Sequence, residues 1–223
     1  MRKILGVVVV LLATAGVVHA APFALTSTAF KAGGNIAQTN AAGIMGCTGE
    51  NKSPALEWKN PPPGTKSFAL MVHDPDAPTG GAGFWHWVVY NIPADTTSLP
   101  EGAGDAAGTG LPKGAVQGNT DVGKPGYIGP CPPPNSPKHH YNFTLYPLKV
   151  DKLDVPPGAT ASYVGFNVNG NVIGKPAKLT GVYARPKEPA APKAAEPVKD
   201  TAKPAGPPPG APSPAPKAPA PPK

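Results

Sequence analysis

Four side chains in this 223-residue chain have the chemistry of a small oxyanion site. Asp74 ends an apolar run, and the prolines that follow it, including Pro78, hold the chain in a rigid turn. His86 stands between two tryptophans, where burial makes a positive charge costly unless an anion or Asp74 is its partner. His139 and Tyr141 are two residues apart in an alternating segment, so we expect them on one face of a strand.

Two imidazoles, a phenol and loop amides near Gly129 would supply hydrogen-bond donors to an oxyanion. The carboxylate of Asp74 either orients a histidine or accepts from a cationic amine. In a ligand with a phosphate and an ammonium group two carbons away, the phosphate would accept from these donors and the ammonium group would pair with the carboxylate. The residue types therefore favour a binding site for a small anion.

Other chemistries are open to the same residues. Asp74, His86 and His139 with a water would make a plausible zinc set, but no closely spaced ligand motif is present. Ser53 and Thr120 are the nearby hydroxyls, and neither lies in a recognisable nucleophile motif. We expect a non-enzymatic protein without cofactor or metal, and keep a phosphoester hydrolase or metal-dependent enzyme as the alternative.

Short strands must position these side chains. With 34 prolines and 27 glycines, the chain is not a helical bundle. Short apolar or alternating runs between Gly and Pro clusters predict a mainly β fold of antiparallel strands in packed sheets, with few short helices. The expected strands lie at 23–30, 67–73, 84–92 and 141–145, the best helix at 159–168, and a long ordered loop at 101–138.

Several motifs together resemble the phosphatidylethanolamine-binding protein family, in its bacterial Raf-kinase-inhibitor-like branch. They are DPDAP at 74–78, FWHW at 84–87, GPCPP at 129–133 and HHY at 139–141, with CTGENKSPALEW at 47–58. The resemblance covers nearly all of 21–185 and implies a β-sandwich with a small anion pocket. Its ligand-binding residues would be Asp74, His86, His139 and Tyr141, with Pro78, Gly129 and Pro130 in the wall. It further implies a ligand such as phosphate or a phospholipid headgroup, and a regulatory role that could include inhibition of a kinase or protease.

The two ends of the chain differ from the middle. Basic residues followed by an apolar run predict a signal peptide over 1–20, cleaved after Ala20, and hence a periplasmic or secreted protein. Residues 186–223, rich in Pro, Ala and Lys, predict a disordered tail, which could contact an anionic cell envelope or have no specific partner. The domain between them, 21–185, has 12 basic and 10 acidic residues, which argues against nucleic-acid binding.

Cys47 and Cys131 are the only cysteines in the sequence. In an exported protein such a pair is expected to form a disulfide, although two free thiols remain the alternative. The bridge would hold the long loop against the body of the domain.

Overall fold

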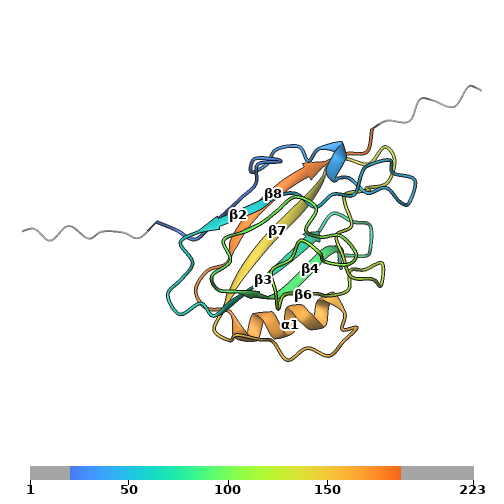
Figure 1. Cartoon of the computed structure of the whole chain (residues 1–223). Helices are drawn as coiled ribbons and strands as arrows, with labels where there is room; N and C mark the ends of the chain where they lie inside the picture. The colour runs from blue at the N-terminus through green and yellow to red at the C-terminus, as the bar shows by residue number, and fades with distance from the viewer. Residues whose placement is uncertain (1–20, 187–223) are drawn as a thin grey trace, which may run out of the picture. The chain divides into compact units, whose positions relative to one another are not determined.

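The computed structural model describes residues 21–186, so the predicted signal peptide and nearly all of the predicted tail lie outside the described residues. The described part is mainly β, as predicted, with one α-helix (Figure 1). Its elements are β1 (Ala24–Thr26), the 3-10 helix η1 (Gln38–Asn40), β2 (Leu56–Lys59), β3 (Ser67–Asp74), β4 (Phe84–Pro93), β5 (Ser98–Leu99), β6 (Val116–Gln117), β7 (His139–Leu148), α1 (Ala161–Asn171) and β8 (Ala177–Tyr183).

The strands form two antiparallel sheets. The larger sheet has the order β6-β4-β3-β7-β8, and the smaller one has the order β1-β2-β5. The long apolar strand β3 lies at the centre of the larger sheet and pairs with β4 on one side and β7 on the other. Because these three strands are neighbours, residues at their ends meet although they are far apart in sequence.

Each face of the larger sheet is covered. On one face, Leu25, Leu56 and Trp58 of the smaller sheet pack with Phe68 and Phe143 in the main core. On the other face, Val164 and Val168 of α1 pack with Ala69, Met71 and Val88, and Figure 1 shows the helix lying along this side. Alternate side chains of β3 and β7 thus belong to two separate cores, one on each face of the sheet.

A β-bulge in β4 sets the direction of one predicted site residue. In the pairing of β3 with β4, Val72 is opposite Trp87 but His73 is opposite Trp85, so His86 is the extra residue. His86 and Trp87 consequently face the main core together, whereas the tilted rings of His73 and Trp85 are in contact on the opposite face, with centroids 4.3 Å apart. Bulges of this kind re-aim side chains next to functional sites.

The predicted elements were located correctly, with differences at their ends. The helix begins at Ala161, where the hydroxyl of Thr160 accepts a hydrogen bond from the Tyr163 amide, and extends to Asn171 instead of ending at 168. Only Ala24–Thr26 of the expected first strand pairs in a sheet. The region 101–138 is irregular apart from the two-residue β6. No helix within residues 21–186 combines the length and the apolar character needed to cross a bilayer.

Candidate functional site

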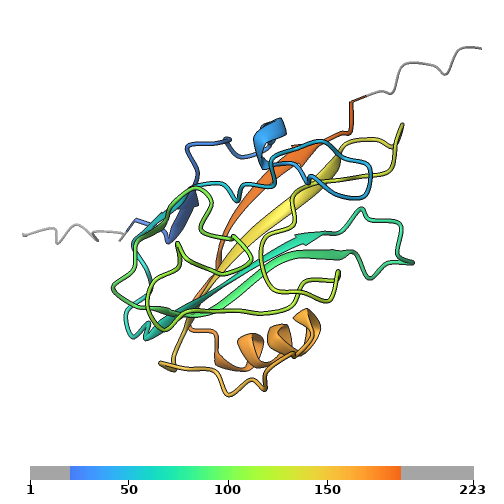
Figure 2. The same cartoon turned by 45° about the vertical axis from the view of Figure 1, so that its right-hand side comes forward.

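A cavity of about 170 Å³ lies where β3, β4 and β7 meet three loops. Figure 2 shows the β3–β4 turn, the loop before β7 and the segment after η1 at the same end of the larger sheet. Two wider surface hollows, of about 590 and 750 Å³, lie elsewhere and contain no histidine. The cavity is lined by Met45, Asp74, Ala77, Pro78, Thr79, Phe84, His86, Cys131, Pro132, Pro133, His139 and Tyr141.

Asp74 and His139 form a buried hydrogen-bonded pair on this wall. Nδ1 of His139 lies 2.8 Å from Oδ2 of Asp74, and both side chains are almost fully buried. The other carboxylate oxygen accepts a hydrogen bond from the Asp76 amide at 2.8 Å. Asp74 is therefore held by the turn that follows it and orients His139, so that Nε2 is the ring nitrogen left for the cavity.

His86 is held by a different partner. Its Nδ1 lies 2.7 Å from the carbonyl oxygen of Ile128, so Nδ1 must carry a hydrogen. Burial lowers the pKa of His86 to about 4, although the Ile128 carbonyl and the charge of Asp74 oppose this effect. His86 is therefore neutral near pH 7, and its Nε2 is a hydrogen-bond acceptor.

The hydroxyl of Tyr141 is buried and makes no hydrogen bond of ordinary length and angle among residues 21–186, although it lies close enough to the Asp74 carboxylate to interact with it. Burial, and then the nearby Asp74 carboxylate, raise the pKa of Tyr141 far above its usual range. The phenol is therefore protonated and has a hydrogen to donate. A buried unpaired hydroxyl is unfavourable in the free protein, and this one belongs to a residue that lines the cavity.

The expected wall residues divide into two groups. Pro78 lines the cavity, whereas Gly129 and Pro130 are not among the lining residues of the described chain. The Gly129 amide donates to Oδ1 of Asn51 at 2.8 Å, and the Ile128 amide donates to the His86 carbonyl. The structure therefore gives Gly129 a hydrogen bond to Asn51 in place of one to a ligand.

A second Asp–His pair lies beside the first on the outside of the domain. Oδ2 of Asp76 accepts hydrogen bonds from the amide and from Nδ1 of His140, at 2.8 and 2.7 Å. In the turn itself, the carboxylate that accepts a backbone hydrogen bond belongs to Asp74 and not to Asp76. Burial opposes the charge of Asp76, yet the His140 bonds outweigh it and lower the pKa of Asp76. His140 faces away from His139 and is exposed.

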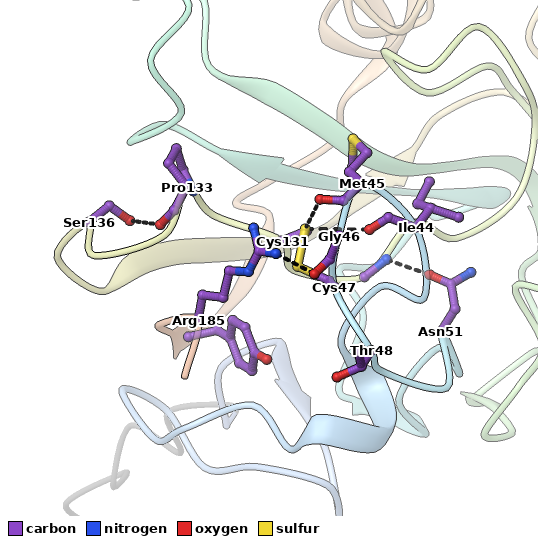
Figure 3. Close-up of a disulfide and its surroundings, with 12 residues drawn as sticks. Ile44, Met45, Gly46, Cys47, Thr48, Asn51, Cys131, Pro133, Ser136 and Arg185 are labelled. Carbon is purple, nitrogen blue, oxygen red and sulfur yellow. Dashed lines mark hydrogen bonds between the residues drawn. A yellow bond between two sulfur atoms is a disulfide. The ribbon is translucent and has the colours of Figure 1, made fainter. Parts of the chain in front are cut away.

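The cysteines are joined in a disulfide, as predicted, with Cα atoms 5.9 Å apart (Figure 3). The bridge connects the segment after η1 to the loop before β7, and both segments contribute to the cavity through Met45 and Cys131. Arg185 donates a hydrogen bond to the carbonyl of Gly46 next to the bridge. The bridge therefore fastens two parts of the wall to each other.

Several lining residues were not predicted. Met45, Thr79, Phe84 and Pro133 join the wall through the loop arrangement, and only Phe84 and Pro133 lay inside motifs noted in the sequence. The Thr79 hydroxyl donates to the Gly83 carbonyl at 3.0 Å. The hydroxyls considered as nucleophiles are engaged elsewhere: Ser53 accepts from the Gly104 amide, and Thr120 donates to the Lys124 carbonyl. Residues 21–186 contain no group of three or more His, Cys, Asp or Glu that could hold a metal ion.

The domain is similar to known proteins in sequence and in structure. Residues 26–184 match the family described as Phosphatidylethanolamine-binding protein. The UPF0098 protein YbcL of Escherichia coli is 47% identical over 165 residues, covering 74% of this chain and 89% of its own. Its crystal structure, described as a new member of the mammalian PEBP family, aligns over 73% of this chain and 98% of its own with a TM-score of 0.70.

Two further relatives extend the range of the match. The PEBP homologue CT736 of Chlamydia trachomatis is 34% identical and aligns over 74% of this chain and 98% of its own, with a TM-score of 0.62. A protein named as a lipoprotein, LppC of Mycobacterium tuberculosis, is 39% identical over 137 residues, which are 61% of this chain and 62% of its own. The match therefore spans most of the described domain in different bacteria.

Proposed function

This chain belongs to the phosphatidylethanolamine-binding protein family, and on that premise we propose that it is an exported, non-enzymatic binding and regulatory protein whose cavity takes a small anionic group. Phosphate or a phosphoethanolamine-like headgroup is the proposed ligand. The residues proposed to bind it are Asp74, His86, His139 and Tyr141. Pro78 forms part of the wall, and Gly129 and Pro130 support the loop behind it.

The buried Tyr141 hydroxyl is the single observation that carries this proposal. A protonated phenol without a partner, in a residue lining a cavity, is completed by a ligand oxygen. His139 stands two residues away on the same strand, already oriented by Asp74. The volume of about 170 Å³ is below the roughly 300–1,000 Å³ of sites for drug-sized ligands, which favours a headgroup-sized one.

A calorimetric titration of the full-length exported chain with phosphoethanolamine tests the proposal. Asp74→Asn removes the charge that orients His139 but keeps an oxygen for the Asp76 amide, and we expect it to weaken binding at least about tenfold. Asp76→Asn is the matched control because the Asp76 carboxylate bonds His140 outside the cavity and reaches His139 only through its charge, so this change should affect the affinity much less. Absence of binding by the unmodified, folded chain would contradict the proposal.

The hydrolase alternative is tested on the same protein. Asp74 and His139 form the kind of pair that orients a catalytic base, which is the feature that keeps this alternative in view. Release of phosphate from p-nitrophenyl phosphate should be undetectable with the unmodified chain. Turnover that His86→Ala abolishes, or stoichiometric zinc in the purified protein, would favour the enzyme over the binding protein.

Export is supported by the disulfide, which persists in oxidising compartments. A relative named as a lipoprotein, LppC, points in the same direction. We expect cell fractionation to recover the chain in the periplasm or medium, with Ala21 as its first residue. A cytoplasmic protein that retains its initial residues would contradict this part of the proposal.

The proposed regulatory role requires a protein partner, such as a kinase or protease that the chain inhibits. Ile44 and Met45 are 46% and 54% exposed beside the cavity and would give such a partner an apolar rim to contact. Contact of the tail with an anionic envelope is a separate proposal that depends on its lysines. Deletion of 186–223 should then release the protein from anionic vesicles and leave phosphoethanolamine binding intact.

A further inference from the structure

The outer face of α1 carries aromatic residues where a surface helix is normally polar. Val164 and Val168 pack into the core, so the opposite side of the helix faces away from the sheet (Figures 1 and 2). On that side Phe166 is 77% exposed, which makes it the most exposed large hydrophobic residue within 21–186. Tyr163, one turn earlier, is 47% exposed. Two neighbouring aromatic side chains that project from one helix indicate a surface made for contact.

The same face has no charge. Residues 155–174 contain no charged side chain, although a helix on the surface of a domain usually carries charged residues on its outer side. The side chains of Asn167 and Asn169 each donate a hydrogen bond of 2.9 Å to the carbonyl four residues earlier, which keeps them against their own helix. The outer face of α1 can therefore be dehydrated without the cost of burying a charge.

A glycine lies one turn after the exposed phenylalanine. Gly170 has no positive φ, and a Cβ added there would meet nothing within 4 Å. Alanine would support the helix better than glycine at such a position. Neither the backbone nor the packing within the described domain thus accounts for Gly170. Its missing side chain leaves open space beside Phe166.

Together these residues make the surface complementary to itself. Ser162, Phe166 and Gly170 form one row of residues four apart, with a large side chain between two small ones. Such rows pack between the rows of a facing helix, at about 8–10 Å between the helix axes. A two-fold axis perpendicular to α1 would bring Phe166 of each copy over Gly170 of the other. The two helices would then run antiparallel, which pairs their dipoles favourably.

We infer that α1 is a self-association surface, through which two copies of this chain pair with Phe166 of each seated over Gly170 of the other. The contact is small, because a helix of 11 residues is about 16 Å long and a standard interface buries about 800 Å² on each partner. The pair should therefore be transient, with a dissociation constant of roughly 0.1 mM. No residue of α1 lines the cavity, so this inference does not depend on the proposed ligand.

Sedimentation equilibrium of the full-length exported chain between about 10 μM and about 1 mM tests the pairing. We expect the mean mass to rise with concentration toward that of a dimer. Phe166→Ser should weaken association at least about tenfold, because it removes the apolar area that the contact buries. Gly170→Gln should also weaken it, since the new side chain fills the space for the phenyl ring. Ile44→Ser is the matched control, because it removes an exposed apolar side chain outside α1 and should change nothing.

The other possible occupants of this face give different results. A single monomer mass over the whole concentration range would overturn the inference. Association that is lost on deletion of 186–223 would assign the face to the tail, and binding of a monomeric chain to phosphatidylcholine vesicles through Phe166 would assign it to a lipid surface. Association that requires Phe166 but tolerates Gly170→Gln would overturn the antiparallel pairing. If Gly170→Gln fails to fold by circular dichroism, slower amide hydrogen exchange of α1 at high concentration identifies the contact on the unmodified chain.

Discussion

The ring of His86 lies edge to face against the ring of Tyr141, with centroids 5.1 Å apart, although β3 runs between their strands β4 and β7. The contact places an acceptor nitrogen and a donor hydroxyl on one wall of the cavity. Asp74, at the end of β3, lies between these strands and holds His139. Three neighbouring strands thus each contribute to one small polar group at the edge of the main core.

Tyr141→Phe should change stability and binding in opposite directions. The variant removes a buried hydroxyl that has no partner in the described chain, so the free protein should be equally stable or up to about 1–3 kcal/mol more stable. Phosphoethanolamine binding should weaken because the donor is lost. Urea unfolding and calorimetry measure the two effects. A variant that is destabilised by several kcal/mol would show that the hydroxyl has a structural partner.

Acidification should destabilise the protein through His86. The folded state has a pKa near 4 at this residue, whereas an unfolded histidine titrates near 6.5, so the unfolded chain binds more protons between these values. The contribution of His86 is complete above about pH 6.5. It is lost as the pH falls to 4, and the free energy of unfolding decreases by about 3 kcal/mol.

Urea unfolding at pH 7, 5.5 and 4.5 measures this loss. His86→Asn lacks the titrating ring, so its free energy of unfolding should decrease less steeply over the same range, whatever its stability at pH 7. An identical slope in both proteins would assign the acid sensitivity to other groups.

The disulfide should contribute strongly to stability because it closes a long loop. Cys47 and Cys131 are 84 positions apart, for which the chain-entropy treatment gives about 4–5 kcal/mol as an upper figure. We expect the Cys47→Ser, Cys131→Ser double variant to lose a large part of this free energy of unfolding and to bind phosphoethanolamine more weakly. Reductant should destabilise the unmodified chain and have no effect on the variant. Equal free energies of unfolding for the oxidised unmodified chain and the double variant would contradict the prediction.

Gly129 should be required for close packing. A Cβ at this position would overlap the carbonyl oxygen of Asn40 and lie 2.5 Å from backbone atoms of Ala41 and Ala42. Gly129→Ala should therefore destabilise the protein by about 1–3 kcal/mol or more. Gly170→Ala is the matched control, because a Cβ there meets nothing within 4 Å and the helix favours alanine. Thermal unfolding of both variants compares them, and equal melting temperatures would contradict the prediction.

The sequence was informative where local spacing decides the geometry. Alternation put His139 and Tyr141 on one face, and the buried runs located β3 and β4. Alternation alone would place His86 and Trp87 on different faces of the sheet. The bulge that brings His86 to the same face as Trp87 arises only when β4 pairs with β3. The Asn51 bond to Gly129 likewise depends on a contact across 78 residues. The short strands β2, β5 and β6 have too few residues for a pattern to show, and β8 was not recognised.

The bulge makes the direction of His86 depend on how many residues β4 contains. Deleting one residue from the stretch between Phe84 and Trp87 would remove the register shift between Val72 and His73 and leave Trp87 in the main core. The sandwich would keep its layers and its hydrophobic contacts while losing the imidazole from the cavity. A β4 strand that is one residue shorter would therefore give a protein with the same fold but without the His86 imidazole in the cavity. The length of this strand can change ligand binding while the fold is kept.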